Sequence, residues 1–312
     1  MNWTSRLASR FRPNVAVQAA PRESKHPLPA QFHHHLTLYE YEASPWCRLI
    51  REYATILDLK LHIRPCPRQT LLLEGAFDVH SRFRPEAMEY VQKYYGSSTN
   101  LTFPLLVDQT ESDSSGPTVI LQSYEILQHL WKNYGQSVST KVPRPDQRWN
   151  SNNIPFVLRF LSLAGPSYVR PWPTCGLLRT PSLWPSSQDD DQREELVLYQ
   201  SEGCPESRLV RETLCTLEIP YLSIPMGLGS SHSLPNPSRS IPVLVDGDCI
   251  LEGARDCQEH LWKKYKDPHG KQPEWWDLPP THNLGRAGSF SVGAYTAFVR
   301  GTRAFVPDRV FE

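Results

Sequence analysis

The sequence predicts an α/β protein in which one structural module occurs twice, joined by a long irregular segment. Residues 38–59 read LYEYEASPWCRLIREYATILDL, and residues 198–219, LYQSEGCPESRLVRETLCTLEI, overlay them without a gap at a shift of 160. Self-similarity at a fixed spacing indicates a repeated architecture. Proline makes up 29 of the 312 residues, well above the usual share of about 5%. This abundance favours ordered modules separated by stiff, irregular chain.

Each copy begins with the pattern of a strand, a turn and a helix. Strand-like residues lead into a short polar turn that is followed by Pro45 or Pro205. Proline suits the first turn of a helix because the N–H that it lacks would be unpaired there. A second strand-like run follows at 60–65 and 221–225, which leaves room for a right-handed parallel crossover. Apolar residues recur between them at helical spacing, at Cys47, Ile50, Ala54 and Leu57 and at Val210, Leu214 and Leu217.

The later part of each copy repeats as well. TFPLLVD at 102–108 matches SIPVLVD at 240–246, and in each a proline stands just ahead of a short apolar strand. LQHLWKNY at 127–134 matches QEHLWKKY at 258–265, and both segments are predicted to be helices.

A middle helix is predicted over 85–94 in the first copy. In the second copy, residues 227–239 are rich in Gly, Ser and Pro, so that helix is expected to be shortened or missing. The resulting order, β-α-β-(α)-β-β-α, is that of the thioredoxin fold. We therefore expect two thioredoxin-like domains in tandem.

The ends and the middle of the chain lack this pattern. Residues 1–22 are rich in arginine and contain no acidic residue, a composition typical of an organelle transit peptide, although an ordinary disordered tail is the alternative. Residues 136–194 are rich in proline and show no helical or strand pattern. A structureless connection of that length is uncommon inside one compact domain. The predicted organisation is a transit peptide or disordered segment at 1–34, a first domain at 35–135, a linker at 136–194, a second domain at 195–267 and a tail at 268–312.

Composition excludes several classes of function. The chain has 33 basic and 33 acidic side chains, which argues against nucleic-acid binding driven by counterion release. Its longest apolar stretch falls short of the 18 or more residues that a membrane span needs. The 7 cysteines are scattered, without the spacing of a disulfide framework or a zinc site. No metal site is predicted.

The turn motifs carry a resemblance to a known family. ASPWCR at 43–48 and GCPESR at 203–208 stand where glutaredoxins and glutathione-transferase N-terminal domains have a Cys-Pro-x-Cys or Cys-Pro-x-Ser turn. With a proline before the third strand of each copy, the chain resembles the tandem glutathione-transferase-N/glutaredoxin-like proteins of plants and algae. Many of those are plastid proteins, so the resemblance implies a chloroplast location ahead of a mitochondrial or cytoplasmic one. It also implies glutathione as substrate or ligand.

Cys204 is the candidate nucleophile. A thiol at a helix N-terminus faces the positive end of the helix dipole and unpaired N–H groups, which stabilise the thiolate. By resemblance to monothiol glutaredoxins, Cys204 forms a mixed disulfide with glutathione and acts on thiol-containing proteins. Ser207 takes the position of the resolving cysteine, so no disulfide can form within this turn. The alternative is that Cys204 only caps the helix, and a buried Cys204 sulfur would argue against the nucleophile.

In the first copy the pattern is reversed. Ser44 takes the nucleophile position and Cys47 the resolving position. A serine there is a good N-cap, and the resemblance to glutathione transferases implies instead that Ser44 donates a hydrogen bond to the glutathione thiolate. Cys47, one turn into the helix, is expected to be packed, and no dithiol chemistry is expected in this domain.

The resemblance also implies the rest of a glutathione site. The proline before the third strand, Pro104 or Pro242, is usually cis in this fold. It exposes the backbone of the residue before it, Phe103 or Ile241, for pairing with the cysteinyl unit of glutathione.

A second part of that site is expected at the start of the last helix, where transferase-like domains use Glu/Gln-Ser to hold the γ-glutamyl carboxylate. Gln122 and Ser123 match this pattern at a positive helix N-terminus. In the second copy the expected equivalent is Glu252 with Gly253, one residue further from the shared His-Leu-Trp.

Two arginines follow each turn motif and have two possible roles. Arg48 and Arg51, like their counterparts in the second copy, could attract an anionic tripeptide. The alternative is that they are surface arginines paired with glutamates on the same helix, such as Glu52 and Glu212.

Three functions are consistent with these patterns. The first is a glutathione-dependent oxidoreductase or transferase with Cys204 as nucleophile. The second is a non-catalytic binding or scaffold protein. The third, iron–sulfur cluster handling, has less support because monothiol glutaredoxins of that kind usually end the motif in Gly-Phe-Ser. Transferases normally append a helical domain of about 100 residues, for which neither linker nor tail shows the periodicity.

Overall fold

The computed structural model describes residues 36–67, 81–109, 116–135, 183, 195–202, 204–227, 230–235, 238 and 240–269. The predicted transit peptide, the tail from residue 270 and the linker apart from Leu183 lie outside these residues. None of the helices in the described ranges is long and apolar enough to cross a membrane.

Both copies fold as the repeat predicts. The first module contains β1 (Leu36–Glu40), α2 (Pro45–Leu57), β2 (Leu61–Pro65), α3 (Arg84–Tyr95), β3 (Leu105–Asp108), β4 (Thr118–Leu121) and α4 (Ser123–Tyr134). The second contains β5 (Val197–Gln200), α7 (Pro205–Thr216), β6 (Tyr221–Pro225), β7 (Val243–Asp246), β8 (Cys249–Glu252) and α8 (Ala254–Tyr265). In each module the first two strands are parallel and the last two are antiparallel to their neighbours. The prediction of two thioredoxin-like modules is confirmed.

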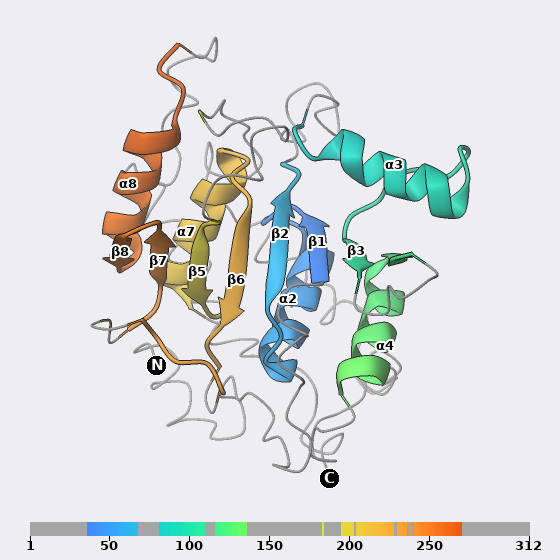
Figure 1. The fold of residues 1–312 in the computed structure, drawn as a ribbon, viewed down its shortest axis with the longest axis horizontal. Helices are drawn as coiled ribbons and strands as arrows, with labels where there is room; N and C mark the ends of the chain where they lie inside the picture. Colours follow the sequence, from blue (N-terminus) through green and yellow to red (C-terminus); the bar gives the residue numbers. More distant parts are fainter. Residues whose placement is uncertain are drawn as a thin grey trace, which may run out of the picture.

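The two modules share one sheet. Within the described residues the strand order is β4-β3-β1-β2-β6-β5-β7-β8, and β2 and β6 lie side by side in its middle (Figure 1). They pair antiparallel, with Leu61 opposite Ser223 and Ile63 opposite Tyr221. At the repeat shift of 160, Leu61 corresponds to Tyr221 and Ile63 to Ser223, so exchanging the two modules converts one pair into the other. A pseudo-twofold axis therefore passes between His62 and Leu222, which face each other.

One hydrophobic core runs across both modules. It gathers buried residues of α2, α4, α7 and α8 and one face of the central strands, including Leu38, Ile50, Leu198 and Leu214. Residues such as Tyr39 and Leu105, which alternate with these along the strands, face the other side and pack beneath α3 in a second cluster. The sheet thus has helices on both faces in the first module.

As far as the structure describes it, the second module has no counterpart of α3, in agreement with the sequence. The described residues between β6 and β7 contain no helix, since Gly and Pro oppose helix formation. The edge strand β8 is correspondingly open, and Cys249 and Ile250 are exposed. Ile250 is the counterpart of Val119, which packs in the cluster beneath α3, so its exposure follows from the missing helix.

Candidate functional site

The two turn motifs have the same local structure. Ser44 is the N-cap of α2, and its Oγ accepts a hydrogen bond from the Cys47 N–H at 3.2 Å. Cys204 is the N-cap of α7, and its Sγ accepts from the Ser207 N–H at 3.3 Å. Pro45 and Pro205 each begin the helix that follows. The capping role proposed for Ser44 and Cys204 as an alternative is therefore present in both modules.

Both capping residues are buried. Ser44 and Cys204 are each 1% exposed, although Cys204 lies at the tip of its helix. In this conformation the Cys204 sulfur cannot meet a substrate in solvent, and its role as nucleophile stays a prediction that requires the turn to open. Ser207, at the resolving position, is fully buried, and its Oγ accepts from the Ser201 N–H at 3.4 Å.

Cys47 is packed, as expected. It is fully buried beside α3, and burial is the main cause that raises its pKa to about 12. A thiol with this pKa stays protonated at neutral pH and is a poor nucleophile.

The predicted glutathione site has three parts: the turn at Ser44, the segment Phe103–Pro104 and the helix start at Gln122 and Ser123. All three meet at one edge of the first module. Leu105 pairs with Leu121 across β3 and β4, so the residues just outside this pair, Pro104 and Gln122, are neighbours. Tyr39 pairs with the same Leu105, which brings the turn after β1 to that edge. The Phe103–Pro104 bond is cis, as the resemblance implies, and Tyr41 packs edge-on against Phe103 with ring centroids 6.3 Å apart.

Gln122 and Ser123 begin α4 at this edge. Gln122 is exposed, with a φ of 69°, and Ser123 is half-buried as the first helical residue. The first N–H groups of a helix have no partner within it and attract anions. This helix start therefore offers amide, hydroxyl and backbone donors together.

The second module has a different helix start from the one expected. The Ile241–Pro242 bond is again cis, and the Gly253 N–H donates to the Pro242 oxygen at 2.9 Å. Because α8 begins at Ala254, the counterparts of Gln122 and Ser123 are Gly253 and Ala254.

Glu252 was placed one residue out of register by the sequence comparison. It is the last residue of β8, paired with Val243, and corresponds to Leu121 of the first module. Its Oε1 accepts hydrogen bonds from the Ser240 N–H and Oγ at 2.9 and 2.6 Å. The extra residue that we expected before the shared His-Leu-Trp does not exist.

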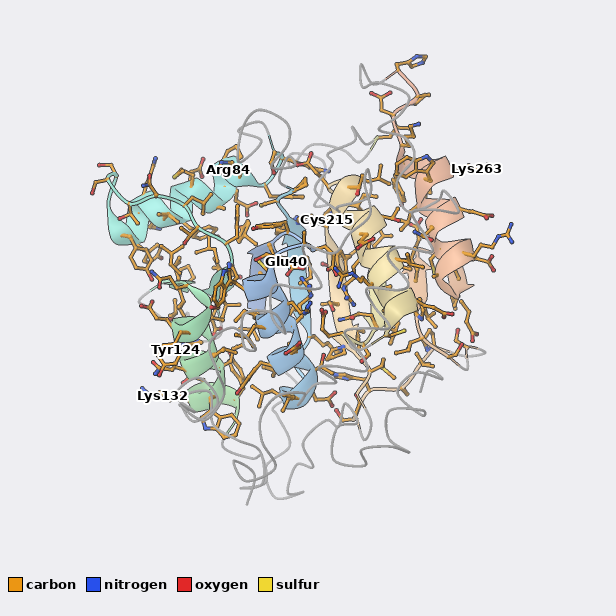
Figure 2. The ribbon with its side chains drawn as sticks, turned by 180° about the vertical axis from the view of Figure 1, so that it is seen from behind. Glu40, Arg84, Tyr124, Lys132, Cys215 and Lys263 are labelled. Atoms are coloured by element: carbon orange, nitrogen blue, oxygen red, sulfur yellow. The ribbon has the colours of Figure 1, made fainter. Side chains whose placement is uncertain are left out.

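The arginines after the turn motifs are buried between the modules, so the alternative that they are surface arginines is wrong. The pairing within each helix is present, since Arg48 lies 3.7 Å from Glu52 and Arg208 lies 3.1 Å from Glu212. Further contacts cross the module boundary and involve Glu42 and Glu202, with Arg51 lying 2.9 Å from Glu202 and Arg211 lying 3.1 Å from Glu42. In Figure 2 the labelled Glu40 lies near this junction.

Glu42 and Glu202 are the residues that sequence reasoning missed. They occupy the same position in both turn motifs. Burial works against their ionisation, but the arginines around Glu42 hold its pKa at about 2 and those around Glu202 lower its pKa too. The identity of this glutamate in both copies, together with the repeated arginine, was the available signal.

Comparison with known proteins agrees with the fold. The family described as glutathione S-transferase, N-terminal domain, matches residues 38–138 and 198–269, which together make up more than half of the chain. The chain belongs to this family. The two matched regions of the glutathione S-transferase N-terminal domain coincide with the two modules. Comparisons with curated proteins and with solved structures found no match. In the described part of the chain, no group of three or more His, Cys, Asp or Glu could hold a metal ion.

Proposed function

We propose that the first module binds glutathione without forming a covalent bond, and that the second module is its structural partner. The observation that carries this proposal is the helix start at Gln122 and Ser123, which adjoins Phe103 and cis Pro104 at one edge of the sheet. Membership of the glutathione S-transferase N-terminal domain family supports glutathione as the ligand.

The chemistry of glutathione fits this edge. Its γ-glutamyl carboxylate is an anion that unpaired helical N–H groups, the Ser123 hydroxyl and the Gln122 amide can hold together. Its cysteinyl unit is extended and offers backbone groups to the Phe103 backbone, as in the addition of a short strand. The α2 N-terminus at Ser44 supplies the positive end of a helix dipole toward the sulfur.

The second module supports binding less well. Its last helix begins with Gly253 and Ala254, which offer neither the amide nor the hydroxyl, whereas the N-caps Ser44 and Cys204 are equally buried and do not distinguish the modules. A glutathione-binding protein without thiol transfer is therefore the function that the geometry favours. Thiol transfer by Cys204 needs an opening of the β5–α7 turn and stays a prediction.

The test exploits the difference between the modules. The double variant Gln122→Gly/Ser123→Ala gives the first module the helix start of the second, and glycine suits the positive φ at position 122. Calorimetric titration with reduced glutathione should show binding to the wild type and at least about tenfold weaker binding to the variant, the loss expected for one hydrogen bond to a charged group.

A matched control is Glu252→Gln, which alters the second module at the residue first assigned to glutathione. It should bind as the wild type does. Unchanged binding by the double variant, or loss of binding in Glu252→Gln, would place the ligand elsewhere.

A further inference from the structure

The boundary between the modules contains a buried cluster of ionisable side chains, which we call the junction cluster. Every member is at most 4% exposed. Its acidic residues outnumber its arginines by one. The members are Glu40, Glu42, Glu52, Glu202 and Glu212 with Arg48, Arg51, Arg208 and Arg211.

The central contacts of this cluster cross the pseudo-twofold axis. Arg51 of α2 lies 2.9 Å from Glu202 of the second module. Its counterpart Arg211 of α7 lies 3.1 Å from Glu42 of the first module. The electrostatic balance of the cluster therefore contributes directly to the contact between modules.

The two halves of the junction cluster differ at one position. Glu40 of β1 pairs with Arg51, whereas its counterpart in β5 is the neutral Gln200. The Gln200 Oε1 accepts from Arg211 Nη1 at 2.6 Å, and its Nε2 donates to the Ser223 Oγ at 3.0 Å. A protonated carboxyl group has nearly the shape of this amide and is likewise neutral, so protonation of Glu40 would make the two halves alike and balance the charges.

We propose that Glu40 holds a proton in the assembled protein near neutral pH, and that releasing this proton weakens the contact between the two modules. The junction cluster would then act as a pH-sensitive device built into the paired modules. Proton loss leaves one more carboxylate than guanidinium groups among the described members of the cluster, and an excess buried charge is strongly unfavourable.

The surroundings of Glu40 support this proposal. Among the described residues, the ionisable groups that act on it are Arg51 and Cys47 of α2, Glu42 of its own turn, Glu202 of the second module's turn and Tyr221 of β6. Only Arg51 among them is a cation. Burial, helped by Glu42 and Glu202 and opposed by Arg51, raises the pKa of Glu40 to about 7.

The direction of the pH effect follows from this shift. In the unfolded chain Glu40 titrates near its ordinary pKa of 4.5, and in the folded protein near 7. Between these values the folded state binds the additional proton, so stability falls as pH rises through this window and is level above it. Glu42 and Glu202 have lowered pKa values, so their contribution is lost only as pH falls below their ordinary range. The two effects therefore occupy different pH ranges.

The test compares the full-length wild type with Glu40→Gln, which copies Gln200. From urea unfolding, the unfolding equilibrium constant of the wild type should rise by about tenfold or more relative to that of Glu40→Gln between pH 5 and pH 8, as expected for a shift exceeding one pKa unit. The matched control Glu259→Gln removes an exposed carboxylate of α8 and should keep the wild-type pH dependence. Parallel pH profiles of wild type and Glu40→Gln would overturn the proposal.

A second measurement needs no variant. Infrared spectra of wild type with labelled glutamate should show a protonated carboxyl band at pH 6 that disappears by pH 9. Absence of this band at pH 6 would also overturn the proposal.

A third test adds a carboxylate to the other half of the cluster. Gln200→Glu should steepen the fall of the unfolding free energy with pH, and an unchanged slope would contradict the role of the junction cluster.

Discussion

Arg51 Nε donates to Glu202 Oε2 at 2.9 Å, and the two residues belong to different modules. Arg211 and Glu42 repeat the contact on the other side of the pseudo-twofold axis, with Nε and Oε2 3.1 Å apart. Both turn motifs thus place a glutamate against the other module's first helix. The turns that resemble catalytic motifs also hold the two modules together.

Removing one side of this contact should be costly. Arg51→Leu removes the cation that pairs with buried Glu40 and one of those that pair with buried Glu202, so we expect a loss of about 3–5 kcal/mol in the free energy of unfolding, measured by urea denaturation. Arg255→Leu breaks an exposed ion pair with Glu259 and should have little effect. Equal losses of unfolding free energy in the two variants would show that the junction contacts stabilise the protein no more than an exposed ion pair does.

The six cysteines in the described part of the chain should react unequally. Cys249 is exposed, whereas Cys47, Cys204 and Cys257 are buried, so iodoacetamide should label Cys249 first in the native protein and the others only on unfolding. Peptide mapping by mass spectrometry measures each rate. Labelling of Cys204 as fast as Cys249 would show that the β5–α7 turn opens readily. In that case any thiol-transfer activity should disappear in Cys204→Ser.

The N-caps should contribute to stability through their acceptor atoms. Ser44→Ala removes the Oγ that accepts from the Cys47 N–H and should cost about 1 kcal/mol, while Ser44→Gly should cost only a few tenths. Cys204→Ser keeps an acceptor at the second cap and should be better tolerated than Cys204→Ala. Thermal unfolding gives the ranking, and an Ala variant as stable as wild type would exclude a capping role.

A third pH effect is expected at the far end of the sheet. Asp246 accepts from Tyr265 and pairs with His260 and Lys264. Although burial works against it, these contacts lower its pKa below the ordinary 3.8. Its contribution is therefore present above pH 4 and lost as pH falls through the lowered value. Asp246→Asn should reduce the melting temperature at pH 7 and have little effect near pH 2, and equal effects at both would contradict this account.

Much of the fold could be predicted because its signals are local. Helical spacing within the repeat identified α2 and α7, and the Gly, Ser and Pro content of 227–239 indicated the missing helix. The edge that gathers Pro104 and Gln122 was also predictable, since both flank short strands. The position of Glu252 is not predictable in the same way, because Glu252 and Gly253 resemble the start of a Glu/Gln-Ser pattern one residue ahead of the true helix start. Only the pairing of β7 with β8 fixes the register.

The burial of the arginines could not be predicted either. Arg48 and Glu52 have the helical spacing of a solvent-exposed ion pair, and that spacing is the same whether the helix faces water or another module. Cys204 is a similar case. Its place at a helix N-terminus follows from the sequence, whereas its exposure depends on what packs over the turn.

The repeat is visible in the sequence alone, and so are the elements of each module and the residues at each helix start, because these depend on spacing along a few turns of chain. Tertiary structure decided that β2 and β6 join the modules into one sheet and that glutamates from each turn meet arginines of the opposite helix. Those contacts join residues about 150–170 positions apart. Whether a charged side chain there faces water or a partner is settled by the balance of desolvation and pairing across the whole junction, which no local pattern contains.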